Sequence, residues 1–367
     1  MNRTRSPLFR HWVIGSLIRH SSFGFSHFLV LTVGLSASDV QPPNYGFLKG
    51  NTHVHTNGSG DSDTPVALAV KWYEERGYDF IIVTDHNRVT VHPHTQKMLV
   101  FPGVEMTKNE IASEDSGKSE YFCVHMNGYF LTRAKQGFIS DPPVKQHTRL
   151  AMYASEFVAI KELGGFACLN HPNFLYTGDA QILTRLAAQG LRFFEVYNSA
   201  DKSKNDGEPG KPSTEQLWDT VLSTGKILYG IAADDTHHYY DAPKVLNPRI
   251  GNLAWIMVRA GEKKEASIKA AILSGDFYGS TGVTLKKLEI SDKAMDIEVV
   301  GLPGRNYTIR FIGRDGKLLA EAATASSHYE FKGNEMYVRA VVVDSEKKKA
   351  WIQPTFLGKR ADSEGKK

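Results

Sequence analysis

The sequence predicts an α/β fold in which a parallel sheet, open or closed into a barrel, is followed by a small antiparallel β module. From residue 45 to about residue 282, segments with strand and helix patterns alternate, and repeated strand–helix units are typical of parallel sheets. After about Val283, short strand-like runs follow one another, and turns that contain glycine separate several of them. Polar clusters rich in histidine fall where the expected strands end, and barrels carry their reactive groups at such ends.

The expected elements of the first part are recognised by their apolar patterns and by the residues at their ends. Asp63 is a good cap for a helix that has Pro65 in its first turn and Gly77 after its last. The run 78–83 is almost continuously apolar, as a buried parallel strand would be. Strands are expected at 47–53, 78–83, 98–101, 121–125, 166–170, 193–198, 227–232 and 253–258, helices at 63–76, 146–163, 180–188, 213–223 and 264–274, and polar loops at 108–120 and 201–212.

The second part has the texture of a small sandwich-like β module. Its expected strands are 285–290, 296–300, 307–312, 329–332 and 336–343. The predicted organisation is therefore a targeting segment at 1–38, an α/β region at 45–282, a β module at 283–356 and a charged, disordered tail at 357–367.

The composition argues against a nucleic-acid partner. The net charge of the 367 residues is +4, and much of the basic excess lies near the two ends of the chain. A nucleic-acid-binding protein would need a concentrated basic face, which the sequence does not indicate. The two cysteines, Cys123 and Cys168, make no disulfide framework.

The N-terminal segment 1–38 has the pattern of a signal peptide. A basic lead is followed by an apolar run, Phe25–Leu35, and then by small residues. The run is too short to span a bilayer. We therefore expect an exported protein, periplasmic or extracellular; the alternative is an uncleaved segment that anchors it to the membrane.

The motif His53-Val54-His55 begins the candidate metal site. Two histidines one residue apart on a strand point the same way, because side chains alternate between faces. Further nitrogen and oxygen donors follow at later strand ends, and such a set without thiolates suits Zn, Mn or Fe. One ion needs only three or four ligands, so two or three divalent ions are predicted. The candidate ligands are His53, His55, Asp61, His86, Glu105, His125, His171, Asp235 and His237.

A cluster of ions can polarise a phosphoryl or carbonyl oxygen and supply hydroxide from bound water at neutral pH. No protein nucleophile is expected, because no Ser–His–Asp arrangement is visible. Three acidic residues are expected to orient histidines or to cap strand ends: Asp85, Glu195 and Asp234. The candidates for contact with a substrate anion are Arg88, Asn57, Ser280 and His238.

The order of these motifs resembles the PHP superfamily, the metal-dependent hydrolases named for the polymerase and histidinol phosphatase domains. The resemblance covers about residues 46–282 and rests on 53–55, 84–86, 103–105, His125, 170–172 and 235–237. With the exported layout and the β tail, the chain looks most like the CehA/McbA-type branch. The resemblance implies a distorted (β/α)7 TIM-like barrel with a trinuclear site.

The resemblance also implies how the ligands are shared. One ion would take His53, His55, Glu105 and Asp235, and a second would share Glu105 and take His125 and His171. The third would take His86, His237 and a residue after the first motif. Many members have Ser-Asp-Gly at that last place, whereas this chain has Ser59-Gly60-Asp61-Ser62-Asp63. Asp61 is the expected ligand there, and Asp63 is interpreted mainly as the helix cap.

The leading functional expectation is a hydrolase that acts on a small phosphomonoester or phosphodiester. The second hypothesis keeps the metals and changes the bond to a carbamate or carboxylic ester. The third is a non-enzymatic exported binding protein, which would not need an intact ligand set. Nothing in the sequence predicts the oligomeric state.

Overall fold

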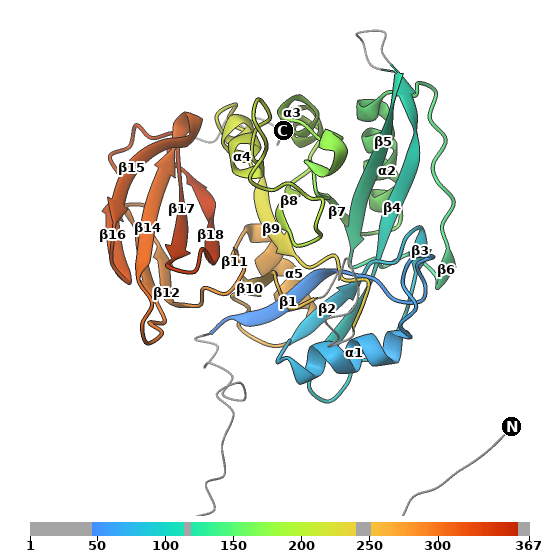
Figure 1. The fold of residues 1–367 in the computed structure, drawn as a ribbon, viewed down its shortest axis with the longest axis horizontal. Helices are drawn as coiled ribbons and strands as arrows, with labels where there is room; N and C mark the ends of the chain where they lie inside the picture. Colours follow the sequence, from blue (N-terminus) through green and yellow to red (C-terminus); the bar gives the residue numbers. More distant parts are fainter. Residues whose placement is uncertain (1–45, 114–118, 240–250, 359–367) are drawn as a thin grey trace, which may run out of the picture. The chain divides into compact units, whose positions relative to one another are not determined.

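A mixed sheet of 13 strands forms the centre of the protein (Figure 1). The computed structural model describes residues 46–113, 119–239 and 251–358, so the predicted targeting segment 1–38 and nearly all of the predicted tail lie outside the described residues. The strands of the first part are β1 (Leu48–Val54), β2 (Phe80–Val83), β3 (Arg88–Val89), β4 (Leu99–Ser113), β5 (Ser119–Tyr129), β6 (Gly137–Phe138), β7 (Phe166–Leu169), β8 (Phe193–Asn198), β9 (Tyr229–Ala233), β10 (Trp255–Val258) and β11 (Phe277–Ser280). The helices are α1 (Val66–Glu75), α2 (Arg149–Glu162), α3 (Ala180–Ala188), α4 (Thr214–Leu222) and α5 (Glu265–Ser274), with short 3-10 turns at Phe174–Tyr176 and Arg314–Gly316.

The α/β class is confirmed, but the sheet is mixed rather than parallel. Strands β1, β2 and β4 pair in parallel, as do β7, β8 and β9. Strand β5 joins the two groups by antiparallel pairing with β4 and β7, and β10 pairs antiparallel with β1. The amide of Asp235, just after β9, donates to the carbonyl of His53 at 3.1 Å, so the end of β9 lies beside the end of β1. A complete (β/α)7 barrel is not confirmed.

The predicted polar loop at 108–120 was wrong in its first part. Strand β4 continues to Ser113 and forms a long hairpin arm with β5, in which Glu110 is opposite Phe122 and Ile111 is opposite Tyr121. Ile111 and Tyr121 are both exposed, whereas Phe122 is buried, so the outer end of the arm lacks the regular buried face that gives a strand its apolar alternation. As a result, Glu105 and His125 lie within strands rather than at strand ends.

The predicted cap at Asp63 was also wrong. Helix α1 begins at Val66 with Pro65 in the cap position, and no side chain caps it. A proline there already fixes the backbone angle that the first turn needs and has no amide hydrogen to satisfy.

The C-terminal part is antiparallel, as predicted, and continues the main sheet. Strands β14, β15, β17 and β18 follow β11 in the sheet order, and β12, β13 and β16 form a separate three-stranded sheet. Strands β15 and β18 were not predicted from the sequence. These strands are β12 (Leu285–Ile290), β13 (Ala294–Val299), β14 (Tyr307–Gly313), β15 (Lys317–Ala322), β16 (Ser326–Glu330), β17 (Tyr337–Asp344) and β18 (Lys349–Phe356). The domain boundary at 282/283 stays a prediction.

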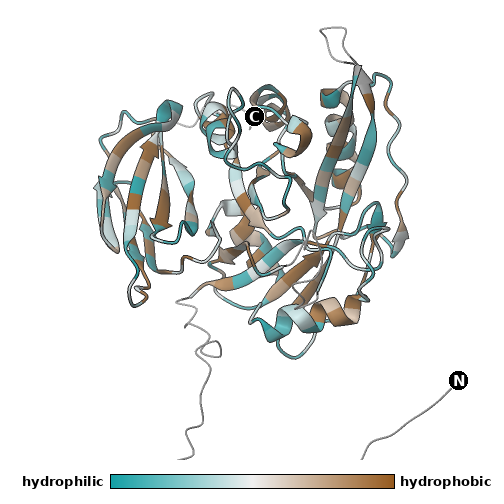
Figure 2. Cartoon of the chain, viewed as in Figure 1, coloured by the Kyte–Doolittle hydropathy of each residue, from teal (hydrophilic) through white to brown (hydrophobic). Residues whose placement is uncertain are grey.

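Apolar residues, brown in Figure 2, occur along the strands and on the helices that cover them, and buried side chains from both form the core. Ile160 of α2, Leu183 of α3 and Trp218 of α4 are completely buried in one cluster with side chains of the strands they cover. Within the described part of the chain, no helix is long and apolar enough to cross a membrane.

Helix α2 also buries an acidic side chain, Glu156, away from any hydrogen-bonding partner in the described part of the chain. Glu156 is completely buried, and neither of its carboxylate oxygens has a hydrogen-bonding partner among the described residues. Burial, reinforced by the negative charge of Asp141, raises the pKa of Glu156 well above 4.5. The folded state therefore retains a proton that the unfolded chain releases, and Glu156 makes stability fall as pH rises above about 4.5.

Replacing Glu156 with Met is expected to stabilise the fold at neutral pH by about 1–3 kcal/mol, the usual cost of an unsatisfied buried group. The gain should be larger at pH 8 than at pH 5, because the wild-type carboxyl loses stability over that interval. Urea unfolding at both pH values measures the gain. Glu162→Gln, at an exposed position of the same helix, is the control and should stay within about 0.5 kcal/mol of wild type. A destabilised Glu156→Met variant would contradict the prediction.

Candidate metal centre

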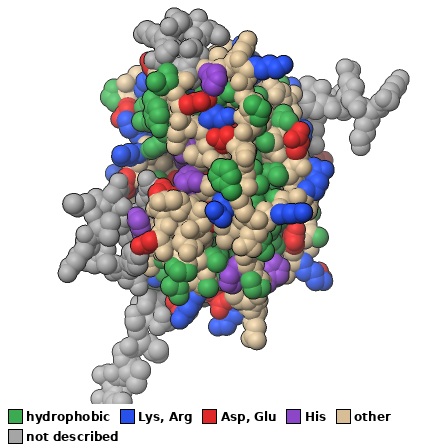
Figure 3. Space-filling view, turned by 90° about the vertical axis from the view of Figure 1, so that its right-hand side faces the viewer, with side chains coloured by type: hydrophobic (Ala, Val, Ile, Leu, Met, Phe, Trp, Pro, Cys, Tyr) green, Lys and Arg blue, Asp and Glu red, His purple; other side chains and the backbone are tan. Residues whose placement is uncertain are grey.

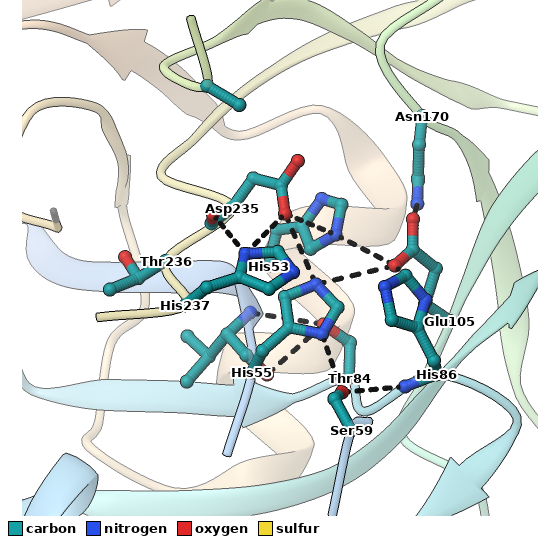
Figure 4. Close-up of polar contacts among 12 residues, drawn as sticks. His53, His55, Ser59, Thr84, His86, Glu105, Asn170, Asp235, Thr236 and His237 are labelled. Atoms are coloured by element: carbon teal, nitrogen blue, oxygen red, sulfur yellow. Dashed lines mark hydrogen bonds and ion pairs between the residues drawn. The ribbon is translucent and has the colours of Figure 1, made fainter. Parts of the chain in front are cut away.

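Strand β1 presents His53 and, one residue past its end, His55 to the same point in space (Figure 4). The Nε2 atom of His53 lies 3.4 Å from Oε2 of Glu105 and 3.3 Å from Oδ1 of Asp235. The Nε2 atom of His55 lies 3.3 and 3.2 Å from the same two oxygens. The period-two geometry of a strand thus aims both imidazoles at one pair of carboxylates.

These four nitrogen–oxygen distances match those between ligand atoms around one ion. A tetrahedral site with bonds of 2.0–2.1 Å separates its ligand atoms by about 3.3 Å. His53 Nε2, His55 Nε2 and Glu105 Oε2 are buried and have no hydrogen-bonding partner among the described residues. Buried polar atoms are costly when unpaired, so their convergence fits a cation that would satisfy them together.

Glu105 uses its other oxygen in a second group. Its Oε1 atom lies 3.0 Å from Nδ1 of His125 and 3.5 Å from Nε2 of His171. It also accepts a hydrogen bond of 2.8 Å from the side-chain amide of Asn170. The carboxylate is 1% exposed. Because its two oxygens face different histidines, it lies between two sets of imidazoles.

A third group contains Asp61, whose two oxygens face different histidines. Oδ1 lies 3.6 Å from Nε2 of His86, and Oδ2 lies 3.1 Å from Nε2 of His237. With His55 they form a set whose candidate ligand atoms all lie within 4.8 Å of one another. The structure thus brings all nine predicted residues into three groups compatible with a metal site. Their role as ligands stays a prediction.

Hydrogen bonds fix which nitrogen of several rings faces the cluster. His53 Nδ1 lies 2.7 Å from Glu195, His55 Nδ1 lies 2.9 Å from Ser59, and His237 Nδ1 lies 3.0 Å from the carbonyl of Asp235. In each ring the partner favours a proton on Nδ1 and leaves the Nε2 lone pair for the cluster. His125 has the opposite arrangement: its Nε2 lies 2.9 Å from Asn109, and its Nδ1 faces the cluster.

The cluster keeps its carboxylates ionised, although Glu105 and Asp235 are buried. Burial alone would raise the pKa of Glu105, but His86, His53 and His125 hold that pKa well below 4.5. Burial and the histidines oppose each other in the same way at Asp61 and Asp235, and both pKa values are lowered. For His53, burial would lower the pKa, but Asp235, Glu195 and Glu105 raise it well above 6.5.

Glu195 lies where the sequence analysis expected a residue that orients histidines. Besides contacting His53, it accepts a bond of 2.7 Å from the backbone amide of His171 and one of 2.8 Å from the side chain of Asn198. It is completely buried. One carboxylate therefore positions members of two ligand groups.

Asp85 acts through a turn rather than by touching a ring. It accepts bonds from the amide and hydroxyl of Thr56, at 2.6 and 2.7 Å, and from the hydroxyl of Ser59 at 3.0 Å. The Ser59 hydroxyl contacts His55 Nδ1 and accepts from the amide of His86 at 3.0 Å. Asp85 thus fixes the hydroxyl that orients His55.

Asp234, the third acidic candidate, lies away from the imidazoles. It accepts bonds of 2.7–2.8 Å from the backbone amides of 252–254 and one of 2.6 Å from the side chain of Asn51. Burial raises its pKa to about 6. Asp234 therefore holds the segment before β10 against β1, and it reaches the cluster indirectly through Asn51, whose side-chain oxygen accepts from the amide of His53 at 3.1 Å.

A cavity of about 220 Å³ opens onto the cluster. The four residues predicted to contact a substrate anion do not line it. Arg88 and Asn57 are exposed elsewhere, and the buried hydroxyl of Ser280 donates to the carbonyl of Val283 at 2.7 Å. His238 is half-buried beside His237 and also lies outside the lining. The cavity is lined by Asp61, His86, Glu105, Asn109, Cys123, His125, His171, Phe174, Ala200, Asp201, Lys202, Ser203, Asp235 and His237.

Sequence reasoning did not assign roles to several residues that contact the cluster or line the cavity. Asn170 and Asn198 stand at strand ends beside predicted residues, and that position is a signal that could have identified them. Ser59 and Lys202 have no such position at a strand end that could have identified them from the sequence. On the face shown in Figure 3, Lys and Arg side chains are scattered among acidic and apolar ones and form no continuous basic surface.

No model of a known protein family matches this sequence, and no curated protein matches it. Among solved structures, the chain is similar to a two-domain protein from Bacteroides vulgatus described as containing a predicted PHP-like metal-dependent phosphoesterase. The likeness has a TM-score of 0.44 at 17% sequence identity and covers 81% of this chain and 91% of that one. A similarity of this size does not by itself indicate an activity.

Proposed function

We propose that this protein is a metal-dependent phosphoesterase of the PHP type that hydrolyses a small phosphomonoester or phosphodiester. The observation that carries the proposal is the convergence of His53, His55, Glu105 and Asp235 at ligand-like separations of 3.2–3.4 Å. The order of the motifs along the chain supports the same assignment. We further propose the CehA/McbA-like branch, and we interpret the sheet as a distorted (β/α)7 barrel whose first strand meets the end of β9.

The ligand groups suggest how two or three ions would be held. His53, His55 and Asp235 would hold one together with Glu105, which lies 3.4 and 3.3 Å from the two histidines. Glu105, His125 and His171 would hold a second, and Asp61, His86 and His237 a third. When bound, divalent ions such as Zn, Mn or Fe would polarise a phosphoryl oxygen and lower the pKa of water beside them. Glu195 and Ser59 keep the Nε2 lone pairs of His53 and His55 directed at the cluster.

The proposal is tested by metal analysis combined with a substrate screen. We expect the purified protein to contain two or three equivalents of divalent metal and to hydrolyse nitrophenyl phosphate or bis-nitrophenyl phosphate. Chelation should abolish turnover, and added Zn, Mn or Fe should restore it. Turnover of aryl esters alone would favour the carbamate or carboxylic ester alternative. Metal-loaded protein that cleaves none of these compounds would contradict a hydrolase and favour a binding protein.

Two variants test whether loss of metal and activity is specific to the candidate ligands. The double variant His53→Ala/His55→Ala should lose metal and turnover while keeping its circular dichroism spectrum. His328→Ala is the matched control, because that histidine is exposed in β16 and pairs with Asp296 at 2.9 Å. Unchanged turnover in the double variant would overturn the metal mechanism.

We also propose that the protein is exported to the periplasm or outside the cell, with 1–38 as its targeting segment and 283–356 as a small β module. The pattern of a basic lead, an apolar run and small residues supports export. The intact mass of protein isolated from its native compartment tests it. A mass that lacks the first 37 or so residues would support cleavage, and the full mass would favour an anchor.

A further inference from the structure

The residues that line the cavity are of three kinds. Seven of them are candidate ligands, and Phe174 and Cys123 are apolar. The turn of residues 200–203, which follows β8, also lines the cavity. Most of that turn lies in the polar loop expected from the sequence at 201–212, and it contains two charged residues, Asp201 and Lys202.

Lys202 is a basic residue in the lining of this cavity. Among the described residues that line it, Lys202 is the single Lys or Arg. Its side chain is exposed and has no ion-pair partner in the described part of the chain. Other lysines of the same loop are engaged: Lys204 pairs with Glu208 at 2.8 Å, and the Lys211 ammonium lies 4.9 Å from the ring centre of Tyr176. Lys202 is thus a cation available to a ligand.

The turn that carries Lys202 is fixed to the cluster by one side chain. The Asn198 side-chain oxygen accepts from the amide of Ala200 at 2.9 Å and from the hydroxyl of Ser203 at 2.7 Å. Its amide group donates to Glu195 at 2.8 Å and to Asp235 at 3.2 Å. The same asparagine therefore contacts a candidate ligand and both ends of the turn, so Lys202 is attached at a defined place relative to the cluster.

Acidic residues in the cavity lining make a nearby cation important for binding an anionic ligand. Asp61, Glu105 and Asp235 line the cavity, and so does Asp201, which precedes Lys202 in the chain. An anionic group of a ligand would be repelled by these carboxylates unless cations face it, and Lys202 is a cation supplied by the protein itself. A lysine ammonium is a compact point charge suited to phosphoryl oxygens.

We propose that Lys202 is a specificity-determining residue that binds the anionic phosphoryl group of the substrate at the cavity wall. This inference rests on the proposed phosphoesterase function. Asn198 supports it by holding the turn of residues 200–203 in place. The side of the cavity formed by Phe174 and Cys123 would face the uncharged part of the substrate.

The test compares Lys202→Met, which keeps the length of the side chain and removes its charge, with Lys202→Arg and Lys211→Met. Metal-loaded forms of each are assayed for KM and kcat on the phosphoester that the wild type cleaves, and for binding of inorganic phosphate by calorimetry. We expect Lys202→Met to raise KM and to weaken phosphate binding by about tenfold, the lower end for a hydrogen bond to a charged group, with little change in kcat. Lys202→Arg should keep most of the binding, Lys211→Met should resemble wild type, and metal content should be the same in all.

The outcomes separate this inference from the proposed function. If the wild type cleaves phosphoesters but Lys202→Met stays within twofold of it in KM and phosphate binding, Lys202 is not the anion contact. If the wild type cleaves none but binds phosphate through Lys202, the phosphoesterase proposal fails and the anion site stands. Equal losses in Lys202→Met and Lys211→Met would show a general charge effect and overturn the assignment. Added salt should reduce the difference in phosphate affinity between wild type and Lys202→Met, because screening weakens an exposed charge contact.

Discussion

Replacing Glu105 with Gln is expected to remove most of the bound metal and to lower kcat/KM by more than about 100-fold. Losing a residue that merely supports a ligand typically costs 10–100-fold in metal affinity or activity, and Glu105 occupies a more central place. Its Oε2 atom faces His53 and His55 at 3.4 and 3.3 Å, and its Oε1 atom faces His125 at 3.0 Å. One substitution therefore disturbs two ligand groups together.

The amide of the Glu105→Gln variant would keep the shape of the side chain and one oxygen, so the bond from Asn170 can persist. The amide would also bring an N–H group toward imidazole nitrogens whose lone pairs face the cluster. Metal content by mass spectrometry and turnover of the screened phosphoester are the measurements. A variant that keeps full metal and activity would show that Glu105 is not a shared ligand.

Glu110→Gln is the matched control for this experiment. Glu110 lies on the same strand, and its carboxylate lies 3.0 Å from His147, an exposed histidine outside the three ligand groups. Its removal should leave metal content and kcat/KM unchanged. The pair of variants thus separates loss of a cluster carboxylate from loss of any acidic group on β4.

The assembly of the candidate cluster could largely be predicted from the sequence, because most of its members follow short buried strands. The strands before His86, His171 and Asp235 were predicted to within a few residues of β2, β7 and β9. Neighbouring parallel strands end at one edge of a sheet, so side chains at those ends meet. At these positions the apolar run predicts where the strand ends, and the parallel sheet brings the strand ends together.

The hairpin of β4 and β5 could not be predicted in this way. Its outer arm is solvent-exposed and rich in polar residues, and only backbone pairing with the neighbouring strand makes it a strand. Glu105 nevertheless reaches the cluster, because it lies on the same face of β4 as Thr107, which contacts His86 at 2.6 Å. The predicted strand 98–101 was too short to include Glu105, but the alternation of side chains along β4 directs Glu105 toward the cluster.

The lining of the cavity was the least predictable feature. Arg88, which was predicted to contact a substrate anion, and Lys202, which lines the cavity, are both basic residues, and residue type alone does not distinguish them. The placement of Lys202 depends on hydrogen bonds from Asn198 to both ends of a turn. Such bonds join groups whose proximity is set by the fold and leave no periodic pattern in the sequence.

The second large effect is expected from Asp219→Ala, which should destabilise the folded protein by about 3–5 kcal/mol, the usual cost of breaking a buried ion pair. Asp219 of α4 accepts from Nε and Nη2 of Arg339 at 2.7 and 2.6 Å and from the hydroxyl of Tyr337 at 2.9 Å. Arg339 is 1% exposed. Without Asp219 its guanidinium would stay buried with only Glu215, at 3.6 Å, near its other nitrogen.

The ion pair joins α4 to β17 and so connects the C-terminal strands to the part of the chain that carries the cluster. Urea unfolding of Asp219→Ala measures the loss of stability. Asp206→Ala is the control, because Asp206 is 94% exposed and lies 3.7 Å from Lys349. The control should change the free energy of unfolding by less than about 1 kcal/mol. The double variant Asp219→Ala/Arg339→Met should recover much of the loss, since an apolar replacement removes the uncompensated charge. If Asp219→Ala costs no more than the control, the buried pair does not hold the two parts together. If the double variant is as unstable as the single one, the loss comes from packing at α4 rather than from the stranded guanidinium.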